Sequence, residues 1–272
     1  DSSTWTTELM YDVNKPISIR PTLGLNNRRA PEVFFGTGRL FSKDDLKTTG
    51  QQQIVGLIDP ELLPGGDAQA DFALPLGSGD LLDTTSVEVC GDGSSTSACG
   101  GFGAVSGAGT ATTFTQLQAL FDAAKAAGGK AGFMIDLSAP GTTPAERVVS
   151  AQALLAKILI TNTDSSGTDT GTIFGEANEC ALNYKTGTGD PTSQSFGVSD
   201  GSDGKTAGVV ETSKDIGRGL PAAPSLHVGT GTGQHVVTAC TQTSTGAIIC
   251  QKITTLAPVQ SSEVSWREPL DK

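Results

Sequence analysis

The sequence predicts an all-β protein with many short strands and a single helix. Glycine supplies 35 of the 272 residues and aromatic residues only 5%, a composition that indicates many turns between short strands. Apolar runs recur along the chain and are separated by turn-forming residues, whereas one segment alone has helical periodicity. Strand meanders with little helix are typical of a β-sandwich or a β-propeller, and the number of four-stranded units favours a propeller.

The length and charge of the chain exclude two classes of partner. A chain of 272 residues can bury a sizeable core. The net charge of -11 argues against a partner held by phosphate contacts, so we expect no nucleic acid. No run approaches the roughly 18 apolar residues that a bilayer requires, so we expect no membrane span.

The first strands are expected between residues 15 and 59. They are Ile17–Leu23, Pro31–Phe35 and Gln53–Ile58. The second of these ends in three consecutive apolar residues before Gly36-Thr37-Gly38, which suits a strand buried on both faces and ended by glycines. Residues 60–130 then form an insertion, acidic and rich in Gly and Ser, which is a candidate partner-binding surface.

One amphipathic helix is expected inside this insertion. Leu117, Leu120, Phe121 and Ala124 fall at i, i+3, i+4 and i+7. The segment follows Thr112-Thr113 and ends at Gly128-Gly129, which predicts about three turns. The apolar stripe is more typical of packing on a sheet than of a groove for a partner.

Strands resume after the helix, which gives three to four four-stranded units in all. They are expected at Gly132–Leu137, Arg147–Ala151, Lys157–Asn162, Thr172–Phe174, Ala181–Tyr184, Ser225–Val228, His235–Cys240, Ala247–Ile253 and Val264–Arg267.

The five cysteines indicate two local disulfides. Cys90 and Cys99 flank a Gly/Ser loop, and Cys240 and Cys250 flank a polar turn between two apolar runs. No C-x-x-C pattern and no histidine near a cysteine supports a zinc site, so an oxidising compartment explains the cysteines better. Cys180 remains as either a buried free thiol or a bridge to another chain.

Three stretches share the order of motifs found in one known family. The first is Arg20-Pro21, then residues 33–40 (VFFGTGRL), residues 44–46 (DDL) and residues 56–59 (GLID). The second is residues 132–137 (GFMIDL) with 146–150 (ERVVS), continuing to Cys180 and residues 182–187 (LNYKTG). The third is residues 265–268 (SWRE). Together they resemble the C-terminal region of the PilY-type proteins, also called PilC, which are type IV pilus biogenesis factors and pilus-tip adhesins.

The resemblance implies a fold and a role. It implies that residues 1–272 are the C-terminal portion of a quinoprotein-like β-propeller, located on the bacterial cell surface or pilus, that binds partners and is not an enzyme. The expected partners are pilins or minor pilins, a host or surface ligand, and an upstream fragment of the same precursor or a neighbouring subunit that closes the propeller. The chain begins at Asp1 without Met, which suggests a processed product or part of a longer precursor.

The residues that carry the family pattern are expected to be structural. They are Arg20, Pro21, Gly36, Thr37, Gly38, Asp136, Arg147, Trp266 and Arg267. The family's Asp-rich calcium loop lies just upstream of the R-P motif, and residues 1–21 do not supply it. We therefore expect no cofactor in this chain, and any calcium belongs to the upstream part of the precursor. The family's G-W is Gly132-Phe133 here, and residues 60–130 are unlike the family core.

The sequence motifs give only weak support for catalysis or metal binding. Residues 200–204 (DGSDG) superficially resemble a calcium loop but lack alternating ligands and a distant glutamate. His227 and His235 have no nearby nucleophile with an orienting acid, and the Gly-rich residues 36–38 and 229–233 do not lead into a helix as a phosphate cradle would.

Two rival functions remain. A quinoprotein dehydrogenase shares the propeller architecture, but such enzymes stack their cofactor on a tryptophan, and Trp5 and Trp266 stand near the two ends of the chain. A subunit or accessory of an extracellular surface filament is the second rival. Abundance in sheared surface material separates a scarce tip protein from a filament subunit.

Overall fold

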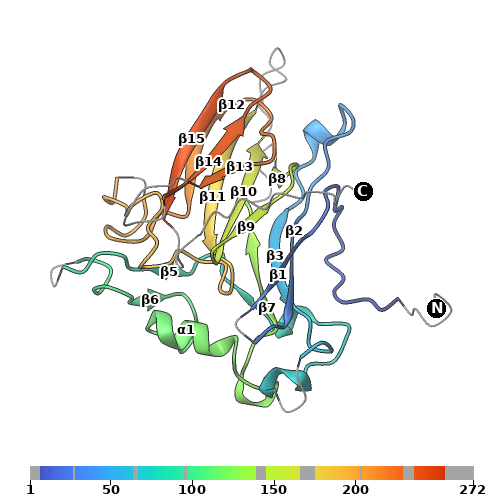
Figure 1. Ribbon diagram of the computed structural model, residues 1–272, viewed down its shortest axis with the longest axis vertical. Coiled ribbons are helices and arrows are strands. Elements are labelled where there is room, and N and C mark those ends of the chain that lie inside the picture. The colour runs from blue at the N-terminus through green and yellow to red at the C-terminus, as the bar shows by residue number, and fades with distance from the viewer. Residues whose placement is uncertain are drawn as a thin grey trace, which may run out of the picture.

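Three sheets, stacked one after another, make up most of this computed structural model (Figure 1). It describes residues 7–254, except 27, 64–66, 95–96, 139–144, 166–174, 203 and 229–235. The strands expected at 172–174 and 264–267 therefore lie outside the described residues. The described residues contain fifteen strands and little helix, so the prediction of an all-β protein is confirmed.

Sheet A contains the N-terminal strands and has the order β1-β2-β3-β7-β4. Its strands are β1 (Thr22–Leu25), β2 (Pro31–Gly36), β3 (Gln53–Ile58), β7 (Gly132–Asp136) and β4 (Leu81–Asp83). Neighbours are antiparallel except β4, which pairs with β7 in parallel. Residues 60–130 therefore contribute a strand to this sheet.

Sheets B and C are antiparallel meanders. Sheet B contains β8 (Glu146–Val148), β9 (Ala153–Leu155), β10 (Ile158–Ser165), β11 (Glu176–Asn183) and β12 (Ser213–Arg218); β8 and β9 lie in tandem along one edge of β10. Sheet C contains β13 (Ser225–Val228), β14 (Val236–Gln242) and β15 (Ile248–Thr254). A separate ribbon joins β5 (Glu88–Val89) to β6 (Val105–Ser106). No sheet among the described strands closes into a barrel or ring.

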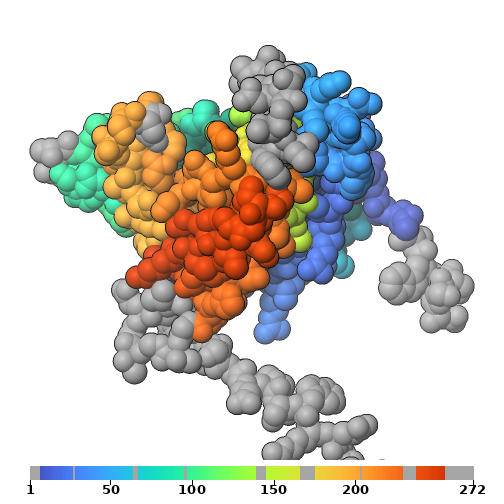
Figure 2. Space-filling view, turned by 90° about the horizontal axis from the view of Figure 1, so that it is seen from above, coloured from blue at the N-terminus to red at the C-terminus, as the bar shows by residue number. Residues whose placement is uncertain are grey.

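Strand β10 shows why sheet B lies in the middle. Its side chains alternate between two faces, and both faces are buried because each meets another sheet. Leu159 packs with residues of sheet A, whereas Ile158 and Ile160 pack with Val237 and Ile253 of sheet C. Seen from above in Figure 2, sheet C (orange to red) and the N-terminal strands of sheet A (blue) occupy different parts of the surface.

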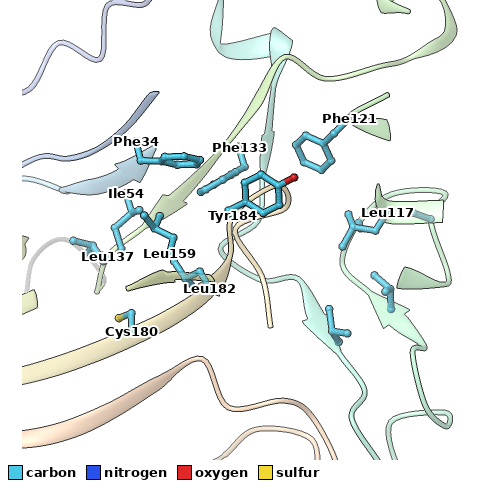
Figure 3. Close-up of a cluster of buried hydrophobic side chains, with 14 of the residues drawn as sticks. Phe34, Ile54, Leu117, Phe121, Phe133, Leu137, Leu159, Cys180, Leu182 and Tyr184 are labelled. Carbon is cyan, nitrogen blue, oxygen red and sulfur yellow. The ribbon is translucent and has the colours of Figure 1, made fainter. Parts of the chain in front are cut away.

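The largest core cluster lies between sheets A and B and extends to the helix (Figure 3). Phe34 of β2 and Phe133 of β7 place their ring centroids 6.4 Å apart, within the range of favourable aromatic pairs. Leu117 and Phe121 bring the helical segment into the same cluster. The apolar stripe of this segment therefore packs on the core, as its periodicity predicts.

Several element boundaries differ from the prediction. The first strand runs from Thr22 to Leu25 instead of Ile17–Leu23. Helix α1 (Phe114–Leu120) has seven residues, about two turns. Thr113 caps its N-terminus, because its hydroxyl accepts a hydrogen bond from the Gln116 N–H. The backbone leaves the helix at Phe121. Strands β4, β9 and β12 were not predicted, because each is short or polar and depends on its neighbours for pairing.

Candidate functional site

The guanidinium of Arg147 joins sheet B to the turn between β2 and β3 of sheet A. Arg147 lies on β8 and is only 2% exposed. Its Nε donates to the Ala145 carbonyl at 3.1 Å, and its Nη1 donates to the carbonyls of Arg39 and Asp45 at 3.1 and 2.5 Å. Burial lowers the pKa of Arg147, and the charges of Asp164 and Asp45 oppose that shift. One buried cation thus holds together segments about 100 residues apart.

The turn that Arg147 contacts is ordered by the Asp45 carboxylate. Arg39 Nε donates to Asp45 at 2.7 Å, and the N–H groups of Phe41 and Ser42 donate at 2.9 and 2.8 Å. The Arg39 bond, together with these N–H groups, holds the pKa of Asp45 well below its usual range. A cavity of about 280 Å³ opens beside Arg39, Asp45 and Arg147.

The Gly36-Thr37-Gly38 motif packs against the same part of β8. A β-carbon on Gly36 would stand 2.3 Å from the Val148 Cβ, and one on Gly38 would stand 2.6 Å from the Arg147 Cβ. Gly38 also has φ +137°, a conformation that favours glycine. Between them, Thr37 is fully buried and its carbonyl accepts a hydrogen bond from the Val148 N–H at 3.0 Å. We call these contacts between residues 36–45 and 145–148 the motif junction.

The remaining family positions lie outside the motif junction. Asp136 ends β7 and accepts a hydrogen bond from Gln53 Nε2 at 2.7 Å. Arg20 and Pro21 are exposed immediately before β1, and Arg20 makes no hydrogen bond or ion pair with the described part of the chain. Trp266 and Arg267 lie outside the described residues, as does Trp5.

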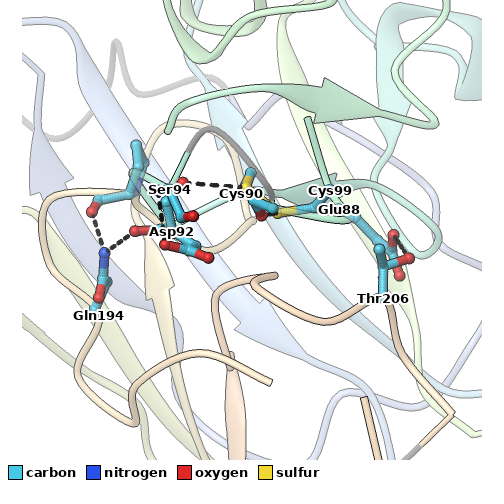
Figure 4. The surroundings of a disulfide bond; sticks show 10 residues. Glu88, Cys90, Asp92, Ser94, Cys99, Gln194 and Thr206 are labelled. Carbon is cyan, nitrogen blue, oxygen red and sulfur yellow. Dashed lines mark hydrogen bonds between the residues drawn. A yellow bond between two sulfur atoms is a disulfide. The ribbon is translucent and has the colours of Figure 1, made fainter. Parts of the chain in front are cut away.

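Both expected local cysteine pairs are disulfides in the structure. Cys90 bonds to Cys99, and Cys240 bonds to Cys250, its direct cross-strand neighbour on β15. The Cys90–Cys99 loop packs on the segment after β11, as Figure 4 shows. Gln194 Nε2 donates to the Gly91 carbonyl at 2.6 Å, and Thr206 Oγ1 donates to Glu88 Oε2 at 2.9 Å.

Cys180 is the unpaired cysteine, and it lies buried in the core between sheets A and B. Burial raises the pKa of its thiol, which disfavours the reactive thiolate. Of the two alternatives left by the sequence, this position favours a free thiol over a bridge to another chain.

A buried acid lies between sheets B and C and was not identified from the sequence. Thr241 Oγ1 donates to Glu179 Oε2 at 3.0 Å, and Asn162 Nδ2 donates to Thr241 Oγ1 at 2.9 Å. Among the described residues, Glu179 Oε1 and Asn162 Oδ1 have no hydrogen-bond partner. Burial raises the pKa of Glu179 to about 7. When Glu179 is protonated, its carboxyl O–H becomes a hydrogen-bond donor. The ionised form has none, although two acceptor oxygens there, Glu179 Oε1 and Asn162 Oδ1, lack a donor.

A second and larger cavity, of about 520 Å³, lies between helix α1 and the end of sheet B. Phe114, Gln118 and Asp122 line it from the helical segment. Lys157, Tyr184 and Lys185 line it from the sheet. Sequence reasoning missed this cavity because its two walls are more than 30 residues apart and neither carries a recognisable motif. We call it the helix pocket.

The positions considered for catalysis or metal binding do not form a site in the described part of the chain. His227 is exposed on β13 opposite Thr238, and His235 lies outside the described residues. No group of three or more His, Cys, Asp or Glu side chains there could hold a metal ion. In the same described residues, no helix has the length and apolar character needed to cross a membrane.

The described fold and cysteine pairs define a disulfide-bonded, all-β protein whose sheets A and B are joined by the motif junction. No family model and no curated protein matches the chain. A solved structure similar to it is that of the C-terminal domain of PilY1 from Pseudomonas aeruginosa, at 17% identity and a TM-score of 0.49. The match covers 88% of this chain and 45% of that one, so the chain spans less than half of its length.

Proposed function

We propose that this chain is a non-enzymatic, type IV pilus-associated protein of the bacterial cell surface, acting as a pilus-tip adhesin or a pilus biogenesis factor. The motif junction carries the proposal. Two stretches that resemble the PilY-type family, residues 33–40 and 146–150, pack on each other through Gly36, Gly38 and Arg147. The two motifs are distant in sequence but pack together in space. This supports a fold in common with the family better than it supports a chance similarity of sequence.

The arrangement of the sheets supports the propeller part of the proposal. Sheets B and C are each built from consecutive antiparallel strands, and sheet A contains the meander β1-β2-β3-β7. Sheet B packs on sheet A through one face and on sheet C through the other. Neighbouring blades of a propeller pack in this way. We infer that the three sheets are blades of an incomplete propeller.

An apolar edge supports the proposal that a partner completes this propeller. Strand β1 is an outer strand of sheet A and has no second neighbour among the described strands. Leu23 and Leu25 on this strand are 72% and 66% exposed. An edge strand with exposed leucines invites pairing with another chain. The expected partner is an upstream fragment of the same precursor or a neighbouring subunit, with pilins or minor pilins and a host or surface ligand bound elsewhere.

The two disulfides support a location outside the reducing cytosol. This fits the proposed extracellular position on the cell surface or pilus. The binding surfaces would be the loops of the propeller, and we propose no cofactor in this chain.

The test is native mass spectrometry of material sheared from the cell surface. We expect this chain to be bound to an upstream fragment or to minor pilins. We also expect the complex to be scarce relative to the major pilin. Recovery of the chain as an abundant homopolymer would replace the proposal with a filament subunit. Quinone absorbance and dye-linked oxidation of alcohols or sugars by the purified chain would replace it with a dehydrogenase.

A genetic experiment tests the motif junction in the same setting. Cells that lack the gene should lose surface pili or adhesion and should regain them with the wild-type gene. Restoration should fail with Arg147→Met and succeed with Lys43→Gln, a change in an exposed lysine. Normal piliation and adhesion in cells without the gene would contradict the proposal.

A further inference from the structure

The helix pocket has the shape and lining of a binding site for a small polar ligand. Its volume of about 520 Å³ falls within the range of ligand sites in proteins. One wall is the outer face of α1, opposite the face that carries Leu117 into the core. The other wall is formed by the β9–β10 turn and the residues that follow β11.

The wall after β11 is held rigidly by its own hydrogen bonds. Asn183 Nδ2 donates to Asp190 Oδ2 at 2.8 Å, and Asn183 Oδ1 accepts from the Lys185 N–H at 3.0 Å. The Thr192 hydroxyl donates to Asp190 Oδ1 at 2.6 Å. A wall that is ordered before binding lowers the entropic cost of taking up a ligand.

The two acidic side chains that line the pocket already have partners. Asp190 accepts the bonds just described. Asp122 accepts from Lys185 Nζ at 2.7 Å and lies 3.5 Å from Arg28 Nη2. Both carboxylates are therefore already paired, so the pocket lacks an unpaired carboxylate that would attract a cationic ligand.

Three lining groups that have no partner among the described residues can each donate a hydrogen bond. The hydroxyl of Tyr184 makes no hydrogen bond among the described residues although the residue is only 5% exposed and lines the pocket. Figure 3 shows this hydroxyl on the Phe121 side of the core cluster, toward the helical segment. Lys157 and the Gln118 amide also line the pocket and make no side-chain hydrogen bond or ion pair within the described chain. The Tyr184 oxygen is not one of the fully enclosed polar atoms that lack a partner, so water or a ligand can reach it from the pocket.

Lys157 is an exposed residue of the two-residue turn that joins β9 to β10, and it lines the pocket. Ala156 and Lys157 connect β9 to β10 and have φ of +47° and +72°, which glycine or asparagine adopts more readily. The carbonyl of Lys157 accepts from the Tyr184 N–H at 3.1 Å. Positive φ at both residues is the usual geometry of a two-residue β-hairpin loop.

We infer that the helix pocket binds a small acidic saccharide, such as a hexuronic acid unit. The hydroxyl-rich ring would accept from Tyr184 and Gln118 and rest against the ring of Phe114. Its carboxylate would meet the ammonium of Lys157, which is exposed and has no ion pair within the described residues. This site is independent of pilus association, because every group that defines it lies within the one chain.

Binding of glucuronate and of glucose to the purified, oxidised 272-residue chain, measured by calorimetry or saturation-transfer NMR, tests the inference. We expect saturable binding of glucuronate and at least fivefold weaker binding of glucose. Lys157→Gln removes the charge and keeps a polar side chain that is one atom shorter, and it should weaken glucuronate binding at least fivefold while leaving glucose binding unchanged. Tyr184→Phe removes only the hydroxyl and should weaken both.

Lys43→Gln is the matched control, because Lys43 is exposed in the turn beside Asp45 and does not line the pocket. Absence of saturable glucuronate binding, equal binding of glucose, or unchanged binding by Lys157→Gln would overturn the inference. Thermal unfolding of each variant separates a lost contact from a misfolded chain. Because the assay uses no pili, its failure would leave the proposed pilus role untouched.

Discussion

Gly36 lies against Val148 so closely that a β-carbon at position 36 would stand 2.3 Å from the Val148 Cβ. The two residues are 112 positions apart, on β2 and β8, and their contact brings sheet A against sheet B. Arg147, the neighbour of Val148, adds three hydrogen bonds to backbone carbonyls. The motif junction therefore combines a steric requirement with a polar one, and each can be tested separately.

Gly36→Ala should destabilise the protein by about 2–3 kcal/mol, because the added methyl group overlaps Val148 and forces the two sheets apart. Chemical denaturation followed by circular dichroism measures the loss. Gly50→Ala is the control, since its β-carbon would come no closer than 3.9 Å to Gln52. Equal stability of the two variants would contradict the close approach.

Arg147→Lys should cost about 3 kcal/mol of unfolding free energy, because an ammonium cannot reach the carbonyls that the guanidinium spans and leaves buried acceptors unpaired. Arg39→Met should cost less than about 1 kcal/mol, because Arg39 is 57% exposed and its ion pair with Asp45 is partly solvated. The same denaturation measurement checks both. A similar cost for the two variants would show that burial does not distinguish them.

The stability of the protein should fall as the pH rises from about 4.5 to about 7. The pKa of Glu179 is raised from 4.5 to about 7 by burial, so the folded state binds a proton more tightly than the unfolded state does. That stabilisation is complete below the unfolded pKa and is lost as the pH passes the folded one. Glu32 acts in the same direction, because burial raises its pKa to about 8.

Glu179→Gln isolates the contribution of Glu179. Between pH 4.5 and 8, the unfolding free energy of the variant should fall by about 3 kcal/mol less than that of the wild type. At pH 8 the variant should be more stable than the wild type. Unfolding titrations at several pH values measure this. The measurements stay above pH 4.5 because the lowered pKa of Asp45 makes the protein less stable as the pH falls further. An unchanged slope in the variant would show that Glu179 is ionised in the folded protein.

Replacing both Cys240 and Cys250 by serine should lower the unfolding free energy by about 2–3 kcal/mol, as loop-closure entropy predicts for a separation of 10 residues. In the variant, Cys90–Cys99 is the disulfide that remains for dithiothreitol to reduce. Peptide mapping without reductant checks the pairing directly. A peptide that joins Cys180 to any other cysteine would contradict it.

Cys180 should not react with a thiol reagent in the native protein and should react once in denaturant, because it is buried in the core and burial raises its pKa. Ellman's reagent measures this. The chain should also run as a monomer in non-reducing electrophoresis. A dimer that disappears with reductant would restore the interchain bridge that the sequence left open.

The local features of this protein could be predicted because they depend on neighbours in sequence. The runs Pro31–Phe35, Gln53–Ile58 and Gly132–Leu137 correspond closely to β2, β3 and β7. Both disulfides close short loops. The helix was predicted too long, because the apolar side chains of Phe121 and Ala124 continue the helical pattern after the backbone has left it.

Other features depend on contacts between distant segments. Nothing within residues 81–83 indicates that this short strand pairs in parallel with β7, some 50 residues later. The burial of Glu179 requires sheet C to cover its face of sheet B, and the helix pocket exists only because α1 lies beside the end of β11.

The sequence by itself determined an all-β chain, two local disulfides and a set of motifs with glycines and an arginine. Each of these follows from residue periodicity or from spacing over a few positions. The tertiary structure alone decided which sheets stack, that Arg147 and Gly36 meet at one junction, and which polar groups lie without partners. The physical reason is that burial and unpaired donors depend on the three-dimensional surroundings of a side chain, which no local pattern contains.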